Sequence, residues 1–246
     1  METITVKCFD DGVTLFTINR PERRNAISAL TAVELQQAFE EFDQSPSQRV
    51  AVITGAGNDA FTAGADVDSI PELWRCLPSI GIKTQKPIIS AVSGWCVGGG
   101  LIITMMSDLA VAAENARFSY PEGRLGLTQG MIAGLAGRIP HKAAMEIMLL
   151  GKPMSAERAY NVGLINEVTP NGQHVEVALD MARHLATLAP LVLKTLKKFV
   201  TAVIPEGPSE KYVRTKYDLE VIANSADLAE GFSAFKDKRA PTFTGT

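Results

Sequence analysis

Apolar residues along this chain form short strand-type runs that alternate with helical periodicities. The segment ITVKCFDDGVTLFTINR carries Asp-Asp-Gly between two strand-like runs, which predicts a β-hairpin. Ser28 can cap the helix that follows, in which apolar side chains recur at i, i+3, i+4 and i+7: Leu35, Ala38, Phe39 and Phe42. The runs VAVITG and LAVAAE predict buried strands, and residues 67–83 predict a weak helix interrupted by Pro71 and Pro78. Strands alternating with helices predict an α/β fold with parallel strand pairing.

An uncharged, mostly apolar segment lies between Lys86 and Asp108, with three consecutive glycines near its centre. A membrane-spanning helix needs about 20 apolar residues in continuous helix. Here Pro87 begins the segment and glycines interrupt it, each costing a helix about 1 kcal/mol relative to alanine. We therefore expect a buried strand over PIISAV, a glycine loop and a buried helix over LIITMMSD, and no membrane span.

From Thr128 onward the sequence signals are almost entirely helical. We expect an α/β core over residues 1–185 and a helical C-terminal region over residues 186–246.

Composition narrows the class of protein. The 246 residues carry a formal net charge of −3 with no basic tract, which argues against nucleic acid as a partner. The N-terminal segment has no secretory pattern, and three cysteines without paired or metal-type spacing indicate a cytoplasmic protein with reduced thiols: Cys8, Cys76 and Cys96. No histidine lies in a cysteine cluster, so we expect no metal site, and His141 is interpreted as a capping or surface residue.

Two loops could each present backbone N–H groups at the start of a helix: FTAGAD (residues 61–66) and CVGGG (residues 96–100). Glycine allows a close approach of the backbone to a ligand, and a helix N-terminus offers unpaired N–H donors. The GGG run does not match a phosphate loop or a dinucleotide fingerprint. Two such loops together could hold one oxygen between two donors, as an oxyanion hole does.

The most suggestive reactive group is Glu122, in SYPEGRLGL. It follows a proline in an apolar loop, where burial would raise its pKa toward that of a useful base. The alternative is a loop glutamate paired with Arg124. No Ser-His-Asp arrangement is visible.

Several segments resemble the enoyl-CoA hydratase/isomerase (crotonase) superfamily: NRPERRNAIS, FTAGADV, KPIISAVSGWCVGGGLIITMMSDLAVAAENARFSYPEGRLGL, MSAERAYNVGLINEV and EGFSAFKDKRAPTFTG. The resemblance covers nearly the whole chain in the right order. It implies a ClpP-like spiral of ββα units with a C-terminal helical region, assembled as a homotrimer or a dimer of trimers. The implied substrates are acyl-CoA thioesters, with coenzyme A as part of the substrate and no separate cofactor.

The resemblance also implies roles for individual residues. The N–H groups of Ala65 and Gly99 would form the oxyanion hole, and Glu122 would be the catalytic acid/base. Residues implied in binding the CoA ester are Arg24, Ala26, Ala63, Asp66, Val67, Trp95, Val97, Gly98 and Pro121. Trp95 is open to a second interpretation, as a core residue.

The chain departs from the family's hydratases at one position. Those enzymes use two glutamates, and the position of the first is Ile102 here, while Glu122 matches the second. The family's Δ3,Δ2-enoyl-CoA isomerases resemble this arrangement, so we expect isomerisation with Glu122 as the only proton shuttle. The alternatives are another reaction through a thioester enolate, a hydratase with a relocated acid, and a non-catalytic CoA-binding or RNA-binding homologue.

Three residues could supply a relocated acid: Asp68 and Glu72, which would lie one helical turn apart, and Tyr120. A stripe of Lys194, Lys197 and Lys198 could meet CoA phosphates or form a solvated helix face. The segment TQG at residues 128–130 replaces the family's usual proline-containing turn.

Overall fold

The computed structural model describes residues 1–246 and contains two β-sheets. The six-stranded sheet has the order β1-β2-β3-β5-β7-β10, and the four-stranded sheet has the order β4-β6-β8-β9. The strands of the first sheet are β1 (Ile4–Cys8), β2 (Val13–Ile18), β3 (Val50–Gly55), β5 (Ile88–Val92), β7 (Leu109–Ala113) and β10 (Glu167–Thr169). Those of the second are β4 (Ala60–Thr62), β6 (Trp95–Val97), β8 (Arg117–Ser119) and β9 (Met154–Ser155).

Consecutive strands of the middle of the chain alternate between the two sheets. The chain passes from β3 to β4, from β5 to β6 and from β7 to β8, each time leaving the large sheet for the small one. The strands β2, β3, β5 and β7 are neighbours in parallel, and β1 and β2 form the predicted antiparallel hairpin across Asp-Asp-Gly. This winding is the predicted spiral of ββα units.

The longer helices are α1 (Ala29–Gln44), α2 (Gly99–Met106), α4 (His141–Leu150), α6 (His174–Thr187), α7 (Pro190–Val203), α8 (Pro208–Ala223) and α9 (Ala226–Asp237). Two short α-helices, α3 (Glu122–Leu125) and α5 (Ala156–Asn161), and 3₁₀ turns at Pro21–Arg23, Leu73–Cys76 and Met131–Gly137 complete the fold. Ser28 caps α1 as predicted, because its hydroxyl accepts a hydrogen bond from the Thr31 N–H at 3.1 Å.

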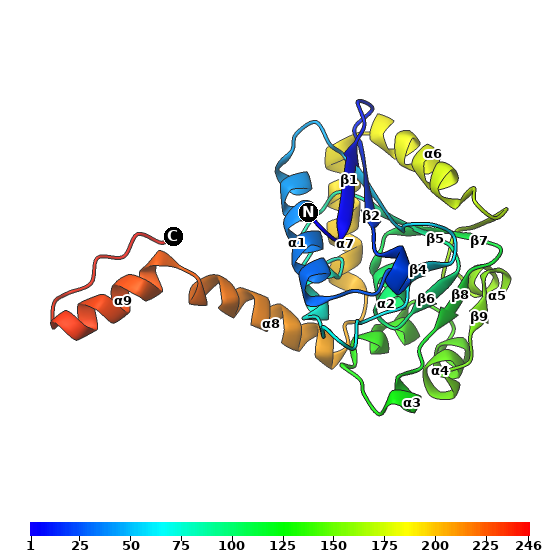
Figure 1. The fold of residues 1–246 in the computed structure, drawn as a ribbon. Helices are drawn as coiled ribbons and strands as arrows, with labels where there is room; N and C mark the ends of the chain where they lie inside the picture. Colours follow the sequence, from blue (N-terminus) through cyan, green and yellow to red (C-terminus); the bar gives the residue numbers. More distant parts are fainter.

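The two faces of the large sheet are covered by different helices (Figure 1). On one face α6 packs four small or apolar side chains on the strands: Ala178, Leu179, Ala182 and Ala186. On the other, Phe39 of α1 stacks on Phe16 of β2 with ring centroids 4.0 Å apart. Because both faces are covered, β3 is buried at every residue, which explains the uninterrupted apolar run VAVITG.

Two segments differ from the sequence prediction. Residues 67–83 form loops and the single 3₁₀ turn Leu73–Cys76, because Pro71 and Pro78 deny the segment a continuous helix. Beyond residue 128 the chain still contributes two short strands, β9 and β10, which add to the edges of the two sheets. Both strands have only two or three residues, too few to show a strand periodicity in the sequence.

The C-terminal helices leave the body of the molecule. Figure 1 shows α7 against the sheet layer, whereas α8 and α9 extend away from it as an arm. The predicted boundary at residue 185 falls within α6 and stays a prediction. The apolar segment 87–107 folds as β5, β6 and α2, and none of the helices in the structure has the length and apolar character needed to cross a membrane.

Candidate active site

The first part of the site is the turn between β6 and α2. Gly98 joins them with φ 52° and ψ −109°, a conformation that residues with a Cβ rarely adopt. Gly99 is the first residue of α2, so its N–H has no acceptor within the helix. The turn therefore leaves the N–H of Gly99 available to a ligand.

The second part is the loop after β4. The N–H of Ile27 donates to the carbonyl of Gly64, and the N–H of Asp66 donates to the carbonyl of Ile27, both at 2.8 Å. Ala65 lies between them, is exposed, and its own N–H has no acceptor in the protein. A Cβ placed on Gly64 would lie 3.0 Å from the carbonyl oxygen of Val97. The loop of Ala65 and the turn of Gly99 are therefore in contact through these neighbours.

Glu122 completes the site from the start of α3. Its Oε1 lies 2.8 Å from the position that a Cβ on Gly98 would occupy. Its Oε2 is buried and has no hydrogen-bond partner, and Arg124 forms no ion pair with it. Burial raises the pKa of Glu122 to about 7, the value expected of a base that works near neutral pH. The alternative of a glutamate paired with Arg124 is therefore wrong.

Ile102 lies one helical turn after Gly98, on the same face of α2. Its N–H donates to the carbonyl of Gly98 at 3.2 Å, and its side chain is 3% exposed in the main apolar core. An aliphatic side chain can neither give a proton nor hold a water molecule. The carboxylate of Glu122 therefore has no acidic partner at this position.

Comparison with known proteins agrees with this geometry. The family model described as enoyl-CoA hydratase/isomerase matches residues 9–246. The chain belongs to the enoyl-CoA hydratase/isomerase family.

Its relatives within that family match it along almost the whole length. A carnitinyl-CoA dehydratase of Salmonella typhi is 35% identical over 247 residues, covering 93% of this chain and 94% of the relative. An (E)-benzylidenesuccinyl-CoA hydratase of Thauera aromatica is 34% identical over 254 residues, covering 95% of this chain and 96% of the relative. Among solved structures, a carnitinyl-CoA hydratase from Mycobacterium avium superposes with a TM-score of 0.77 at 31% identity, with 100% of both chains covered. These likenesses confirm the crotonase fold.

Two of the three candidates for a relocated acid form ion pairs with basic side chains. Asp68 forms an ion pair with Arg23, and Glu72 forms ion pairs with Arg75 and Lys216. The hydrogen bond from Lys216 lowers the pKa of Glu72 to about 2, so Glu72 stays ionised and cannot serve as an acid near neutral pH. The two carboxylates also do not lie one helical turn apart, because residues 67–72 form no helix.

The third candidate, Tyr120, is buried, and its hydroxyl is 2.9 Å from the hydroxyl of Thr128. Burial raises the pKa of Tyr120. Its phenol is therefore occupied by a protein partner.

The residues predicted to bind CoA come together around the loop of Ala65. The turn at Arg24 and Ala26 lies directly on it, because the N–H of Ala63 donates to the carbonyl of Arg24 at 2.9 Å. Arg24 and Val67 are exposed there and free to meet a ligand.

Asp66 differs from these neighbours because its carboxylate is 3% exposed and bonded to Arg20 at 2.8 Å and to Arg23 at 3.1 Å. The hydrogen bond from Arg20 lowers the pKa of Asp66. Arg20 also donates to the carbonyl of Ala26 at 2.6 Å. Asp66 therefore holds the two segments together through its buried carboxylate, and a direct contact of Asp66 with CoA stays a prediction.

The remaining predicted binding residues flank the site. Val97 and Gly98 end β6 beside Glu122, and Pro121 precedes Glu122. Trp95 lies at the start of β6 and is 41% exposed, so its interpretation as a core residue is wrong.

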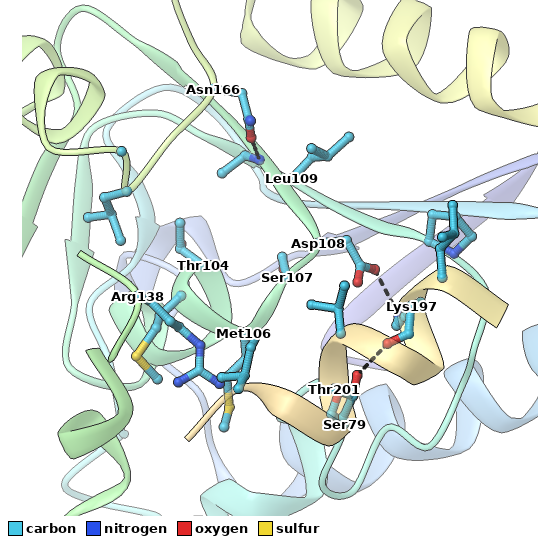
Figure 2. A pocket seen from close by; sticks show the side chains of 18 of the residues that line it. Ser79, Thr104, Met106, Ser107, Asp108, Leu109, Arg138, Asn166, Lys197 and Thr201 are labelled. Carbon is cyan, nitrogen blue, oxygen red and sulfur yellow. Dashed lines mark hydrogen bonds and ion pairs between the residues drawn. The ribbon is translucent and has the colours of Figure 1, made fainter. Parts of the chain in front are cut away.

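The lysine stripe on α7 is not a uniform solvated face. Lys197 donates to the carboxylate of Asp108 at 2.7 Å and to the carbonyl of Lys86 at 2.8 Å. Both bonds attach α7 to the residues that precede β5 and β7, which removes Lys197 from the candidates for a CoA phosphate contact. Figure 2 shows this pair in a cavity of about 460 Å³ at the C-terminal end of α2, the end opposite Gly99. That cavity is the larger of the two main ones, but it contains none of the residues predicted to react.

Two structural features were missed from the sequence. Thr128 is the partner of Tyr120, although the sequence marked TQG only as an unusual turn. His174 is 3% exposed and neither ring nitrogen has a partner, and its position as the first residue of an amphipathic helix gave no signal of burial. His141, in contrast, is exposed at the start of α4, in agreement with the surface interpretation.

Proposed function

We propose that this chain is an isomerase of 3-enoyl-CoA thioesters, moving the double bond from C3 to C2 with Glu122 as its only proton shuttle. Two observations together support the proposal. Glu122 is half-buried and its pKa is raised to about 7, and the aliphatic Ile102 occupies the position where a hydratase would need a second acid. Hydration needs one group to activate water and another to protonate C2, whereas isomerisation needs one group that removes and returns the same proton.

The proton and the electron pairs balance in this scheme. Ionised Glu122 removes a proton from C2, and the electrons delocalise over the dienolate to the thioester oxygen. The N–H groups of Ala65 and Gly99 stabilise that oxygen, and each donor of this kind typically contributes about 2.7–4 kcal/mol to the transition state. Protonated Glu122 then returns the proton to C4, which places the double bond at C2 and restores the carboxylate.

A hydratase or dehydratase is the second candidate, because the curated relatives named above carry those activities in their names. It would require an acid that the site does not offer among its expected candidates, since Asp68 and Glu72 are ion-paired and Tyr120 is bonded to Thr128.

One experiment separates the two candidates. Purified protein is offered 3-hexenoyl-CoA and 2-hexenoyl-CoA separately, and the thioester products are identified by liquid chromatography and mass spectrometry. We expect 2-hexenoyl-CoA from the first substrate and no hydrated product from the second. Formation of 3-hydroxyhexanoyl-CoA alone would overturn the single-base proposal.

Glu122→Gln serves as the paired variant. It keeps the shape of the side chain and removes the base, so we expect turnover to fall by about 10²–10⁴-fold. Binding of the thioester, measured by calorimetry, should stay within about twofold because the amide donors and the CoA-binding segment are intact.

The predicted homotrimer, or dimer of trimers, also remains a proposal. The arm of α8 and α9 supports it, because exposed aromatic side chains lie on α9 (Phe232 and Phe235) and on the segment that follows it (Phe243).

A further inference from the structure

We infer that the hydrogen bond between Tyr120 and Thr128 is a clasp that holds Glu122 at its working position and keeps it desolvated. The inference rests on the proposed role of Glu122 as the base. It assigns to Tyr120 and Thr128 a positioning role for which the sequence gave no expectation.

The segment that carries Glu122 has few hydrogen bonds to hold it, although α3 also packs against α4. Residues 123–129 are all exposed, and Gly123 and Gly126 have open space around them. The backbone bonds of the segment are local, from the N–H of Arg124 to the carbonyl of Pro121 and from the N–H of Leu127 to the carbonyl of Glu122. These bonds shape a turn but do not attach it to the core.

The carboxylate of Glu122 does not anchor the segment either. Its Oε2 has no partner, and its Oε1 lies against Gly98, which offers no side chain to bind it. The location of the carboxylate must therefore come from the backbone on either side of it.

The bond between Tyr120 and Thr128 joins the two ends of the segment that carries Glu122. Tyr120 follows β8 directly, is 5% exposed and belongs to the main apolar core, so its ring is a fixed point. Its hydroxyl lies 2.9 Å from Oγ1 of Thr128, on the far side of Glu122 in the chain. The same Oγ1 accepts from the N–H of Gly130 at 3.0 Å, immediately before the buried residue Met131.

The hydroxyl of Thr128 thus links the end of β8 to the start of the next buried turn. Glu122 lies between these two attachment points in the chain. Removing the hydroxyl would free an exposed segment with two unconstrained glycines. Water would then reach the carboxylate, and the desolvation that raises its pKa would weaken. Loss of the clasp should therefore lower the pKa of Glu122 and misplace the base.

The test compares Thr128→Val, Tyr120→Phe, their double variant and Thr128→Ser. Thr128→Val keeps the shape of the side chain and removes the hydroxyl, whereas Thr128→Ser keeps the hydroxyl. Thr187→Val, which removes an exposed hydroxyl bonded to the carbonyl of His184 at the end of α6, is the matched control.

The direct measurement is the pKa of Glu122 in the free protein, from NMR titration of its side-chain carboxyl carbon assigned with Glu122→Gln. We expect Thr128→Val and Tyr120→Phe each to lower it by at least about one pH unit. Thr128→Ser and Thr187→Val should keep the value of the parent protein. Tyr120→Phe breaks only the bond between the two side chains, whereas Thr128→Val also removes the acceptor of the Gly130 N–H. The double variant should therefore match Thr128→Val and show no further shift.

The kinetic measurement follows isomerisation of 3-hexenoyl-CoA. The two single variants should lose about 10- to 100-fold in kcat with little change in KM, since a small misplacement of a reacting group is costly. An unchanged pKa of Glu122 in Thr128→Val, or additive shifts in the double variant, would overturn the clasp. Absence of isomerisation in the parent protein would refute the proposed function instead and leave the titration as a valid test.

Discussion

The carboxylate of Glu122 lies against Gly98, with its Oε1 2.8 Å from the place where a side chain at position 98 would begin. The two residues come from different ββα units, β6–α2 and β8–α3. Their contact places the only candidate base beside the first N–H groups of α2. We therefore expect the reactivity of the site to depend on Gly98 as well as on Glu122.

The first prediction concerns pH. Because burial raises the pKa of Glu122 to about 7 and the base must be ionised, kcat for isomerisation should rise with pH through that value and then level off. The profile is measured between about pH 5 and pH 9, a range that brackets the titration. Thioester binding over the same range provides the control, and a rate that is flat from acid to neutral pH would show that another group is the base.

The second prediction concerns Gly98→Ala. The backbone at φ 52° and ψ −109° is strained for alanine, and the new methyl group would meet Oε1 of Glu122. We expect kcat to fall by about 10²-fold or more, comparable to the loss of one oxyanion donor. Gly231→Ala is the control, because its methyl group would make only an ordinary contact of 3.7 Å with Phe243. Full activity in Gly98→Ala would show that the contact does not matter.

The third prediction concerns Ile102→Glu. This change places a carboxyl group one helical turn after Gly98, the residue whose Cβ position lies 2.8 Å from Oε1 of Glu122. We expect hydration of 2-hexenoyl-CoA to appear at least about tenfold above the parent protein, at the low end of what one acid–base group contributes. Ile102→Gln has the same size without the acid and should not gain it. If both variants hydrate equally, the gain comes from space and not from proton transfer.

The fourth prediction concerns acid stability. Burial lowers the pKa of His174 below its ordinary value of 6.5, so the unfolded state binds more protons in the window below 6.5. The contribution of His174 to the free energy of unfolding is therefore fully present above pH 6.5. It is lost as the pH falls from 6.5 toward the lower pKa of the folded state. The maximum slope is about 1.4 kcal/mol per pH unit for one proton.

His174→Leu should remove this slope, measured as the difference from the parent protein in urea unfolding at several pH values. That difference cancels the opposing contributions of buried glutamates such as Glu122. His184→Leu, at an exposed position of the same helix, is the control. Equal slopes in His174→Leu and the parent would contradict the role of His174.

The fifth prediction concerns assembly. Phe235 on α9 is 85% exposed in the single chain, which a stable assembly would cover. Phe235→Asp should weaken self-association by about 30-fold or more, corresponding to the roughly 2 kcal/mol of an interface anchor. The measurement is light scattering across a dilution series, with Lys236→Glu as a neighbouring control. A parent protein that stays monomeric at micromolar concentration would contradict the proposed assembly.

The sequence predicted the parts of the fold that local chemistry decides. The hairpin at Asp-Asp-Gly, the cap at Ser28 and the buried strand at residues 50–55 each follow from a few neighbouring residues. Residues 67–83 were harder, because weak helical propensity cannot overcome two prolines. The strands β9 and β10 exist only because the sheets offer them an edge.

The residues of the site were likewise predictable only in part. The resemblance to a family located Glu122, Ala65 and Gly99, and the structure places them in neighbouring loops. The use of Asp66 and Thr128 could not be predicted, because their partners lie 46 and 8 residues away and the choice among partners is made by tertiary packing. The burial of His174 likewise depends on what packs over the start of α6.

The backbone conformation of Gly98 restricts which residues can occupy that position. In the proposed mechanism the groups that polarise the thioester are main-chain amides, so an exchange of side chains leaves these donors in place, and the bend at Gly98 disfavours any residue with a Cβ. Position 102 lies one turn further along the same helix, where the helical backbone accepts residues with a Cβ and only core packing limits the choice. In that mechanism the backbone fixes the amide donors, whereas the side chains at positions 102 and 122 decide what becomes of the enolate, so a new reaction can arise by side-chain exchange without rebuilding the backbone.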